Sequence, residues 1–158
     1  MDEGLAKVKL GDTELEVTRL GYGAMELRGG TGGRSIDEGQ AAQILNAILD
    51  TGINFIDTSI DYGHSEELIG RHISQRRKEF FLASKCGCPV NPTPGVSEHI
   101  FTRENIISGI NQSLTRMKTD YLDAVQFHAS PSKTVLEQEG AIQTLLDLKD
   151  QGKIRLLG

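Results

Sequence analysis

The sequence lacks the features that mark several large classes of protein. It has no tryptophan, only two cysteines, and no apolar run near the ~18 residues that a membrane-spanning helix needs. Two cysteines cannot build the disulfide framework of a small secreted protein, and the charged N-terminal residues 1–16 do not form a secretory signal. We therefore expect no membrane partner and a reducing, cytoplasmic setting.

An excess of positive charge is also missing. The 158 residues carry 22 acidic and 17 basic side chains, for a net charge of -5. Phosphate-rich partners require clustered lysine and arginine, so the composition argues against binding of nucleic acid. The one basic cluster, Arg76–Lys78, is short, and we expect it to be a solvated loop between a helix and a strand. With 37% apolar and 25% charged residues, the chain is typical of a soluble globular protein.

Segments typical of strands and helices alternate along the chain. The predicted strands are a hairpin over 8–17 and segments at 19–23, 53–56, 80–84, 122–127 and 154–157, and the predicted helices lie at 35–51, 65–73, 102–117 and 134–151. This order implies parallel strands joined by right-handed crossovers, either in an open doubly wound sheet or in part of a (β/α)₈ barrel. Residues 1–158 contain no linker or change of composition, so a single domain is predicted.

Polar residues are predicted at the starts of three helices. Ser35 and Glu38 have the spacing of a capping box, in which the serine is the N-cap. Ser65 and Thr102 precede the next two helical segments, and both residue types are favoured N-caps.

A partial dinucleotide-binding motif lies after the first predicted strand. Gly21 and Gly23 match its first two glycines, but Glu26 occupies the position of the third. That glycine is needed for close packing of helix against strand, so a Rossmann domain is disfavoured. We interpret the two glycines as allowing a tight turn.

Ionisable residues follow three of the predicted parallel strands. Asp57, Lys85 and His128 lie at the carboxyl ends of the second, third and fourth strands, and Tyr62 is five residues after Asp57. Each alone is often structural, but the carboxyl edge of parallel strands is where α/β proteins build their sites. A lysine charge favours tyrosinate, so such a tyrosine can exchange a proton with a carbonyl oxygen. No side chain here supplies a hydride, so reduction would require a nicotinamide cofactor.

The pair Cys86 and Cys88 raises the possibility of a metal site. Two ligands one residue apart need at least two more, no second cysteine pair follows, and His99 is only a loose candidate. We therefore predict no metal site from the sequence.

Five stretches together resemble the aldo-keto reductase family. They are "RLGYGAM", "GINFIDTSIDYGHSEELIG", "FFLASKCG", "MKTDYLDAVQFHAS" and "GKIRLLG", in the family's order and across nearly the whole chain. The resemblance implies a (β/α)₈ barrel of the TIM type whose bottom is closed by the hairpin over 8–17. It also implies NADPH/NADP⁺ as the cofactor and reduction of aldehydes or ketones to alcohols.

The resemblance assigns roles to the strand-end residues. Tyr62 would be the general acid, Lys85 would increase its acidity, and Asp57 would pair with Lys85. His128 would orient the carbonyl group of the substrate. The positions that match the segments near the nicotinamide riboside are Gly23, Ala24, Met25 and Asp57.

The chain departs from this family in its length. It offers four strand–helix units and the start of a fifth strand, whereas a complete barrel has eight and typically about 250 residues. In the family, most contacts to the pyrophosphate and adenosine phosphate come from the second half. We therefore expect an N-terminal fragment or truncated product that is incomplete as a catalyst and prone to self-association through its unpaired strand edges. The alternative is a non-catalytic module, derived from a barrel, that binds a partner or regulates an intact homologue.

Overall fold

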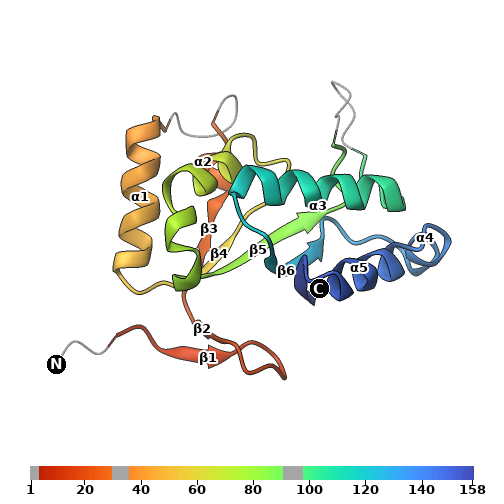
Figure 1. Cartoon of the computed structure of the whole chain (residues 1–158), viewed down its shortest axis with the longest axis horizontal. Coiled ribbons are helices and arrows are strands. Elements are labelled where there is room, and N and C mark those ends of the chain that lie inside the picture. The colour runs from red at the N-terminus through yellow and green to blue at the C-terminus, as the bar shows by residue number, and fades with distance from the viewer. Residues whose placement is uncertain (1–3, 30–35, 91–97) are drawn as a thin grey trace.

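The computed structural model describes residues 4–29, 36–90 and 98–158. Its centre is a parallel sheet with the strand order β3-β4-β5-β6-β7, and an antiparallel hairpin, β1-β2, lies below it (Figure 1). The strands are β1 (Lys7–Lys9), β2 (Glu16–Thr18), β3 (Tyr22–Gly23), β4 (Phe55–Asp57), β5 (Phe81–Cys86), β6 (Leu122–Phe127) and β7 (Ile154–Leu157). The α-helices are α1 (Glu38–Asp50), α2 (Ser65–His72), α3 (Arg103–Met117), α4 (Lys133–Gln138) and α5 (Ala141–Asp150), and the 3₁₀ helices are η1 (Ala24–Arg28) and η2 (Ser74–Glu79).

Consecutive parallel strands pair with one another throughout the sheet. Asp57 lies opposite both Gly23 of β3 and Ala83 of β5, and Lys85 lies opposite Gln126 of β6. This sequential order, with a helix between successive strands from β3 to β7, is that of a (β/α)₈ barrel and not of a doubly wound sheet, whose strand order reverses. The structure is a partial barrel of five parallel strands, as the sequence predicted.

The hydrophobic core lies between the sheet and the helices that cover it. Ile56 and Leu82, on neighbouring strands, are fully buried together with helix residues such as Leu45, Ile69 and Ile106. The opposite face of the sheet carries Asp57 and Lys85, because successive side chains of a strand point to opposite faces. In the described ranges, none of the helices has the length and hydrophobicity that a membrane crossing demands.

Two of the three predicted helix caps are wrong in detail. The N-cap of α1 is Asp37, which accepts from the backbone N–H of Gln40 while the Gln40 side chain accepts from the Asp37 backbone. The capping box is thus two residues later than expected. Gln40 takes the role that was predicted for Glu38, because glutamine and glutamate can both close a capping box. Ser35 lies outside the described residues. Thr102 is confirmed as the N-cap of α3.

Ser65 is not a cap but the first residue of α2, with its side chain fully buried. Its hydroxyl donates to the carbonyl oxygen of Ala24 at 3.0 Å and bonds the hydroxyl of Thr58 at 2.8 Å. A serine that looked like a local helix signal therefore connects the end of β3 to the segment after β4.

The last predicted helix is two helices. The segment 134–151 is interrupted between α4 and α5, where Gly140 has a φ of 61°. This left-handed conformation is readily adopted by glycine and cannot continue a right-handed helix. The apolar residues with helical spacing lie in α5, where Ala141, Leu145 and Leu148 are buried, whereas α4 has no buried residue. The prediction extended this helix back to Thr134, across Gly140.

The basic cluster is solvated only in part, and it lies in η2 rather than in a loop. Lys78 is exposed, whereas Arg77 is largely buried at the base of the sheet. Its guanidinium donates to Asp123 Oδ2 at 2.6 Å and its side chain is only 11% exposed. Asp123, 2% exposed, also accepts from Arg155 at 2.9 Å and from the backbone N–H of Leu82 at 2.9 Å. Both guanidinium groups lie over the Tyr121 ring, with Cζ of Arg77 4.2 Å and Cζ of Arg155 4.0 Å from its centroid.

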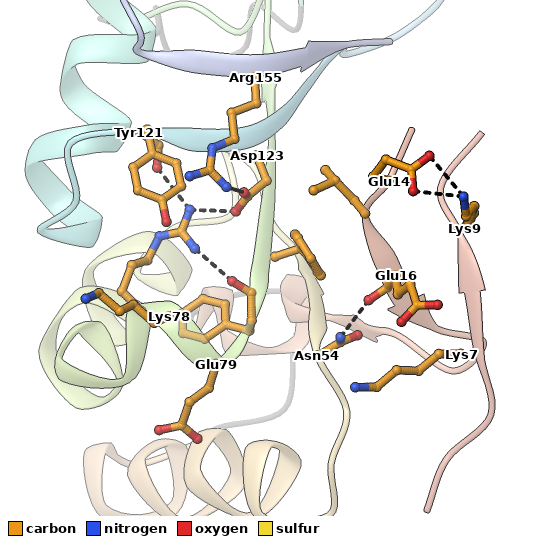
Figure 2. Close-up of a pocket in the computed structure, with 14 residues that line it drawn as sticks. Lys7, Lys9, Glu14, Glu16, Asn54, Lys78, Glu79, Tyr121, Asp123 and Arg155 are labelled. Carbon is orange, nitrogen blue, oxygen red and sulfur yellow. Dashed lines mark hydrogen bonds and ion pairs between the residues drawn. The ribbon is translucent and has the colours of Figure 1, made fainter. Parts of the chain in front are cut away.

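These residues line a cavity of about 450 Å³ between the hairpin and the base of the sheet (Figure 2). The cavity lies at the amino ends of the strands, whereas Asp57, Lys85 and His128 lie at the carboxyl ends. Polar residues at the bottom of a (β/α)₈ barrel typically serve stability. We therefore interpret the Arg77–Asp123–Arg155 group as structural.

Helices α2 and α3 approach each other closely at Gly70. A Cβ atom there would collide with the carbonyl oxygen of Arg116 and lie 2.7 Å from the Cα of Met117. We expect Gly70→Ala to lower the free energy of unfolding by about 1–3 kcal/mol, because backbone atoms must move apart. Urea denaturation measures this. Gly109→Ala in α3 is the matched control, since its new methyl would meet only side chains at 3.6 Å or more, and no loss of stability is expected. Equal effects of both changes would contradict the close approach.

Candidate active site

The four residues predicted to form a site lie together at the carboxyl edge of the sheet. Asp57 is the last residue of β4, Lys85 the fifth residue of β5, and His128 directly follows β6. Tyr62 lies in the loop between β4 and α2. Parallel pairing of the three strands brings these side chains to one edge from positions up to 71 residues apart, from Asp57 to His128.

Lys85 and Asp57 form a close ion pair. Lys85 Nζ lies 2.6 Å from Asp57 Oδ2 and 2.8 Å from the carbonyl oxygen of Thr58. The lysine side chain is 13% exposed, so its ammonium group depends on these oxygens for the interactions that water would otherwise supply. The pair fixes a positive charge at a defined point of the site.

Tyr62 extends over this charge. Lys85 Nζ lies 5.0 Å from the centroid of the Tyr62 ring, and the His128 ring stands edge-on to it with centroids 5.9 Å apart. A compact turn holds the loop, because the Tyr62 N–H donates to Ser59 O at 3.1 Å and the Ser65 N–H donates to Tyr62 O at 2.8 Å. The turn runs from Ser59 to Ser65, and it places Tyr62 five residues after the end of β4.

His128 is held by both its backbone and its ring. Its backbone N–H donates to Cys86 O at 2.8 Å, which continues the pairing of β5 with β6. Ring atom Nδ1 lies 3.0 Å from Cys88 Sγ, 3.3 Å from Ser59 Oγ and 3.5 Å from Asp61 Oδ1. Burial lowers the pKa of His128, and the Asp61 carboxylate opposes this only in part. The imidazole is therefore neutral at neutral pH and offers one N–H donor.

Three of the neighbours of His128 were not predicted from the sequence. Ser59, Asp61 and Cys88 come from two loops and lie 40 to 69 residues away from it in the sequence. The only sequence feature that singled out Cys88 was its position two residues after Cys86. The thiol of Cys88 is buried, and burial raises its pKa to about 11.

The residues expected near a nicotinamide differ in how far their backbone and side chains are exposed to a ligand. Gly23, opposite Asp57, is exposed, and a side chain there would meet no atom within 4 Å, so its backbone is open to a ligand. The Met25 side chain is also exposed, at 41%. Ala24 is fully buried as a whole residue, and its carbonyl oxygen already accepts from Ser65, so no part of it is exposed to a ligand. An open backbone, an apolar side chain and the nearby carboxylate fit the nicotinamide end of the cofactor.

The fold and this strand-edge arrangement define the class of protein. The profile of the Aldo/keto reductase family matches residues 19–158. The chain belongs to the aldo-keto reductase family.

Two relatives from Bacillus subtilis illustrate the match. The oxidoreductase YqkF is 33% identical over 98% of this chain and 48% of its own length. The aldo-keto reductase YhdN is 32% identical over 94% of this chain and 45% of its own length. The chain thus spans about half the length of these curated relatives.

Solved structures agree with the fold. The holo form of the aldo-keto reductase AKR11C1 from Bacillus halodurans superposes with a TM-score of 0.83 at 30% identity, covering 98% of this chain and 49% of that one. The structural similarity confirms that the five strands are part of a (β/α)₈ barrel.

Proposed function

We propose that this chain carries the catalytic half of an NADP(H)-dependent reductase that converts aldehydes or ketones to alcohols. The observation that supports it is the position of Lys85 Nζ, 2.6 Å from Asp57 and 5.0 Å from the Tyr62 ring centroid, with the His128 ring against the same tyrosine. A hydroxyl, a fixed positive charge and a neutral imidazole are what protonation of a carbonyl oxygen requires.

In the proposed mechanism, the Tyr62 hydroxyl donates its proton to the carbonyl oxygen of the substrate. The Lys85 ammonium stabilises the tyrosinate that forms, and Asp57 keeps the ammonium in place. The N–H of His128 donates to the same carbonyl oxygen and orients it. NADPH, when bound, supplies the hydride to the carbonyl carbon.

The identity of the cofactor is part of the proposal. A relative from Schizosaccharomyces pombe, 35% identical over 90% of this chain, is named aldo-keto reductase yakc [NADP(+)], which supports NADP(H). A relative from Escherichia coli, 28% identical, is named NADH-specific methylglyoxal reductase. Here Gly23, Met25 and Asp57 would hold the nicotinamide end. Because the chain spans half of its relatives, we propose that phosphate binding and turnover need the remaining strands of the barrel.

The proposal includes the setting and the physical state of the protein. The two cysteines are free and buried, which suits a reducing cytoplasm. In the part of the chain that the structure describes, β3 and β7 are the end strands of the parallel sheet. Unpaired end strands favour association with another chain, so we propose that the 158-residue chain alone self-associates.

Transfer of a labelled hydride tests the proposed reaction. The full-length protein is incubated with NADPH carrying deuterium at C4 of the nicotinamide and with a panel of aldehydes and ketones. We expect one deuterium on the carbinol carbon of the product, detected by mass spectrometry, and a parallel experiment with labelled NADH measures the cofactor preference. Consumption of cofactor without deuterium in any alcohol would contradict reduction by direct hydride transfer.

A second function, as a non-catalytic module, is supported by two observations. The first is the pair of unpaired end strands described above. The second is an Arabidopsis thaliana relative, 31% identical over 82% of this chain, that is named a probable voltage-gated potassium channel subunit beta. A module of this kind should keep its binding to a partner when Tyr62→Phe or Lys85→Met is introduced, whereas a reductase should lose turnover.

A further inference from the structure

A second cluster of reactive side chains adjoins the candidate active site. Asp61, Cys88, His99 and His128 each offer one potential metal-binding atom, and these four atoms lie within 4.8 Å of one another. The four residues come from three connections: Asp61 lies between β4 and α2, Cys88 and His99 between β5 and α3, and His128 directly after β6. No single sequence spacing could indicate them together. In the sequence, the two cysteines had no clear further ligands nearby. In the structure, Cys88 alone belongs to the cluster, and Asp61, His99 and His128 are the three further candidate ligands.

Backbone hydrogen bonds and ring contacts hold the residues of this cluster in place. Cys88 is buried to 2% exposure, and its carbonyl oxygen accepts from the Asn105 side chain at 3.0 Å. The Ile100 N–H donates to Gly87 O at 2.7 Å, which ties the segment of His99 to that of Cys88. The His99 ring stacks on Phe101, with centroids 6.2 Å apart, and meets the His128 ring edge-on at 5.1 Å. The cluster is thus organised before any ion binds.

We propose that these four residues form a binding site for Zn²⁺. A thiolate, two imidazoles and a carboxylate are typical zinc ligands, with Zn–S of about 2.3 Å and Zn–N of about 2.0–2.1 Å. In a tetrahedral site two ligand atoms are about 3.3–3.6 Å apart. Cys88 Sγ and Asp61 Oδ1, at 3.0 and 3.5 Å from His128 Nδ1, are already near that spacing, and the widest separation in the cluster, within 4.8 Å, would close by about 1 Å on binding. When the ion binds, the Cys88 thiol loses its proton to solvent, and the resulting thiolate and the carboxylate supply two negative charges that neutralise the ion. Hard cations such as Mg²⁺ are disfavoured because they prefer oxygen ligands.

The geometry also indicates how such an ion would relate to His128. It is Nδ1 of His128 that faces Cys88 and Asp61, at 3.0 and 3.5 Å, so Nδ1 is the ligand atom. The proton then resides on Nε2, because metal coordination of one ring nitrogen fixes the tautomer. Four protein ligands leave no open position for water, which makes this a closed site with no role in activating a nucleophile. Zinc binding does not depend on the proposed reductase activity.

Zinc binding to the purified protein tests the site directly. The reduced, metal-free protein competes with a chromophoric chelator for Zn²⁺, and Co²⁺ serves as a spectroscopic probe. We expect one tightly bound ion per chain and a thiolate-to-cobalt charge-transfer band. Cys88→Ser should abolish that band, and Cys88→Ser and His99→Asn should each weaken zinc binding by at least about 10-fold.

Two matched variants separate the site from general effects. Cys86→Ala removes the other buried cysteine, and His64→Asn removes an exposed histidine; neither residue belongs to the cluster, and both variants should bind zinc as the parent does. His99 lies on a partly exposed loop, so its variant reports on the site even if Cys88→Ser unfolds. Absence of stoichiometric binding, or binding that His99→Asn leaves unchanged, would overturn the proposal. Zinc binding by a protein that transfers no hydride would leave this site standing and reject only the reductase.

Discussion

Replacement of Tyr62 by phenylalanine is expected to lower kcat for carbonyl reduction by about 10²- to 10⁴-fold, the usual contribution of a general acid. The substitution removes the only group proposed to protonate the carbonyl oxygen. The ring remains, so two contacts are kept: Lys85 Nζ lies 5.0 Å from the ring centroid, and the centroid of the His128 ring lies 5.9 Å from it. Binding of NADPH should therefore change little. Steady-state kinetics and a cofactor titration on the full-length protein measure the two quantities separately.

Tyr121→Phe is the matched control for this experiment. It also removes one phenolic oxygen, but at the base of the sheet, where the guanidinium groups of Arg77 and Arg155 lie over the Tyr121 ring. We expect its kcat to equal that of the parent. Loss of NADPH binding in Tyr62→Phe, with the residual rate of the chemical step unchanged, would contradict the role of Tyr62 as the acid.

Replacement of Asp123 by alanine is expected to reduce the free energy of unfolding by about 3–5 kcal/mol, because it leaves a buried charge without its partner. Asp123 is 2% exposed and accepts from Arg77, Arg155 and the backbone N–H of Leu82. Without it, the guanidinium of Arg77, which is 11% exposed, loses its carboxylate, and the Leu82 N–H loses its acceptor. Urea denaturation followed by circular dichroism gives the change.

Asp147→Ala provides the comparison. Asp147 also pairs with an arginine, Arg103, at 2.7 Å, but the two side chains are 32% and 50% exposed. Exposed ion pairs contribute little to stability, so only a small change is expected. If the two alanine variants had the same stability, the buried group at the base of the sheet would not have the structural importance that we give it.

The fold could be predicted from the sequence because its signals are local. The apolar stripe of α3, its Thr102 cap and the strand at Phe81–Cys86 depend on residues within one turn or one strand. Boundaries were predicted less well where two local signals compete. Asp37 and Ser35 are both acceptable N-caps, and Gly140 separates α4 from α5 within a segment that was predicted as one helix.

Misassigned residues were those whose partners are distant in the sequence. Ser65 has the right composition for a cap, yet its hydroxyl donates to Ala24, 41 residues earlier. Arg77 reads as a solvated residue, yet it pairs with Asp123, 46 residues later. No pattern in the neighbourhood of either residue distinguishes these outcomes.

The sequence by itself determined the order of strands and helices, the family, and the placement of Asp57, Lys85 and His128 at strand ends. It did so because strand periodicity and strand order follow from local composition, and parallel strands present their carboxyl ends at one edge. Only the tertiary structure decided which side chains meet there. The 2.6 Å pair of Lys85 with Asp57 and the approach of Asp61, Cys88 and His99 to His128 depend on how separate loops pack over that edge. Loop packing is set by long-range contacts, and these leave no period or spacing in the chain.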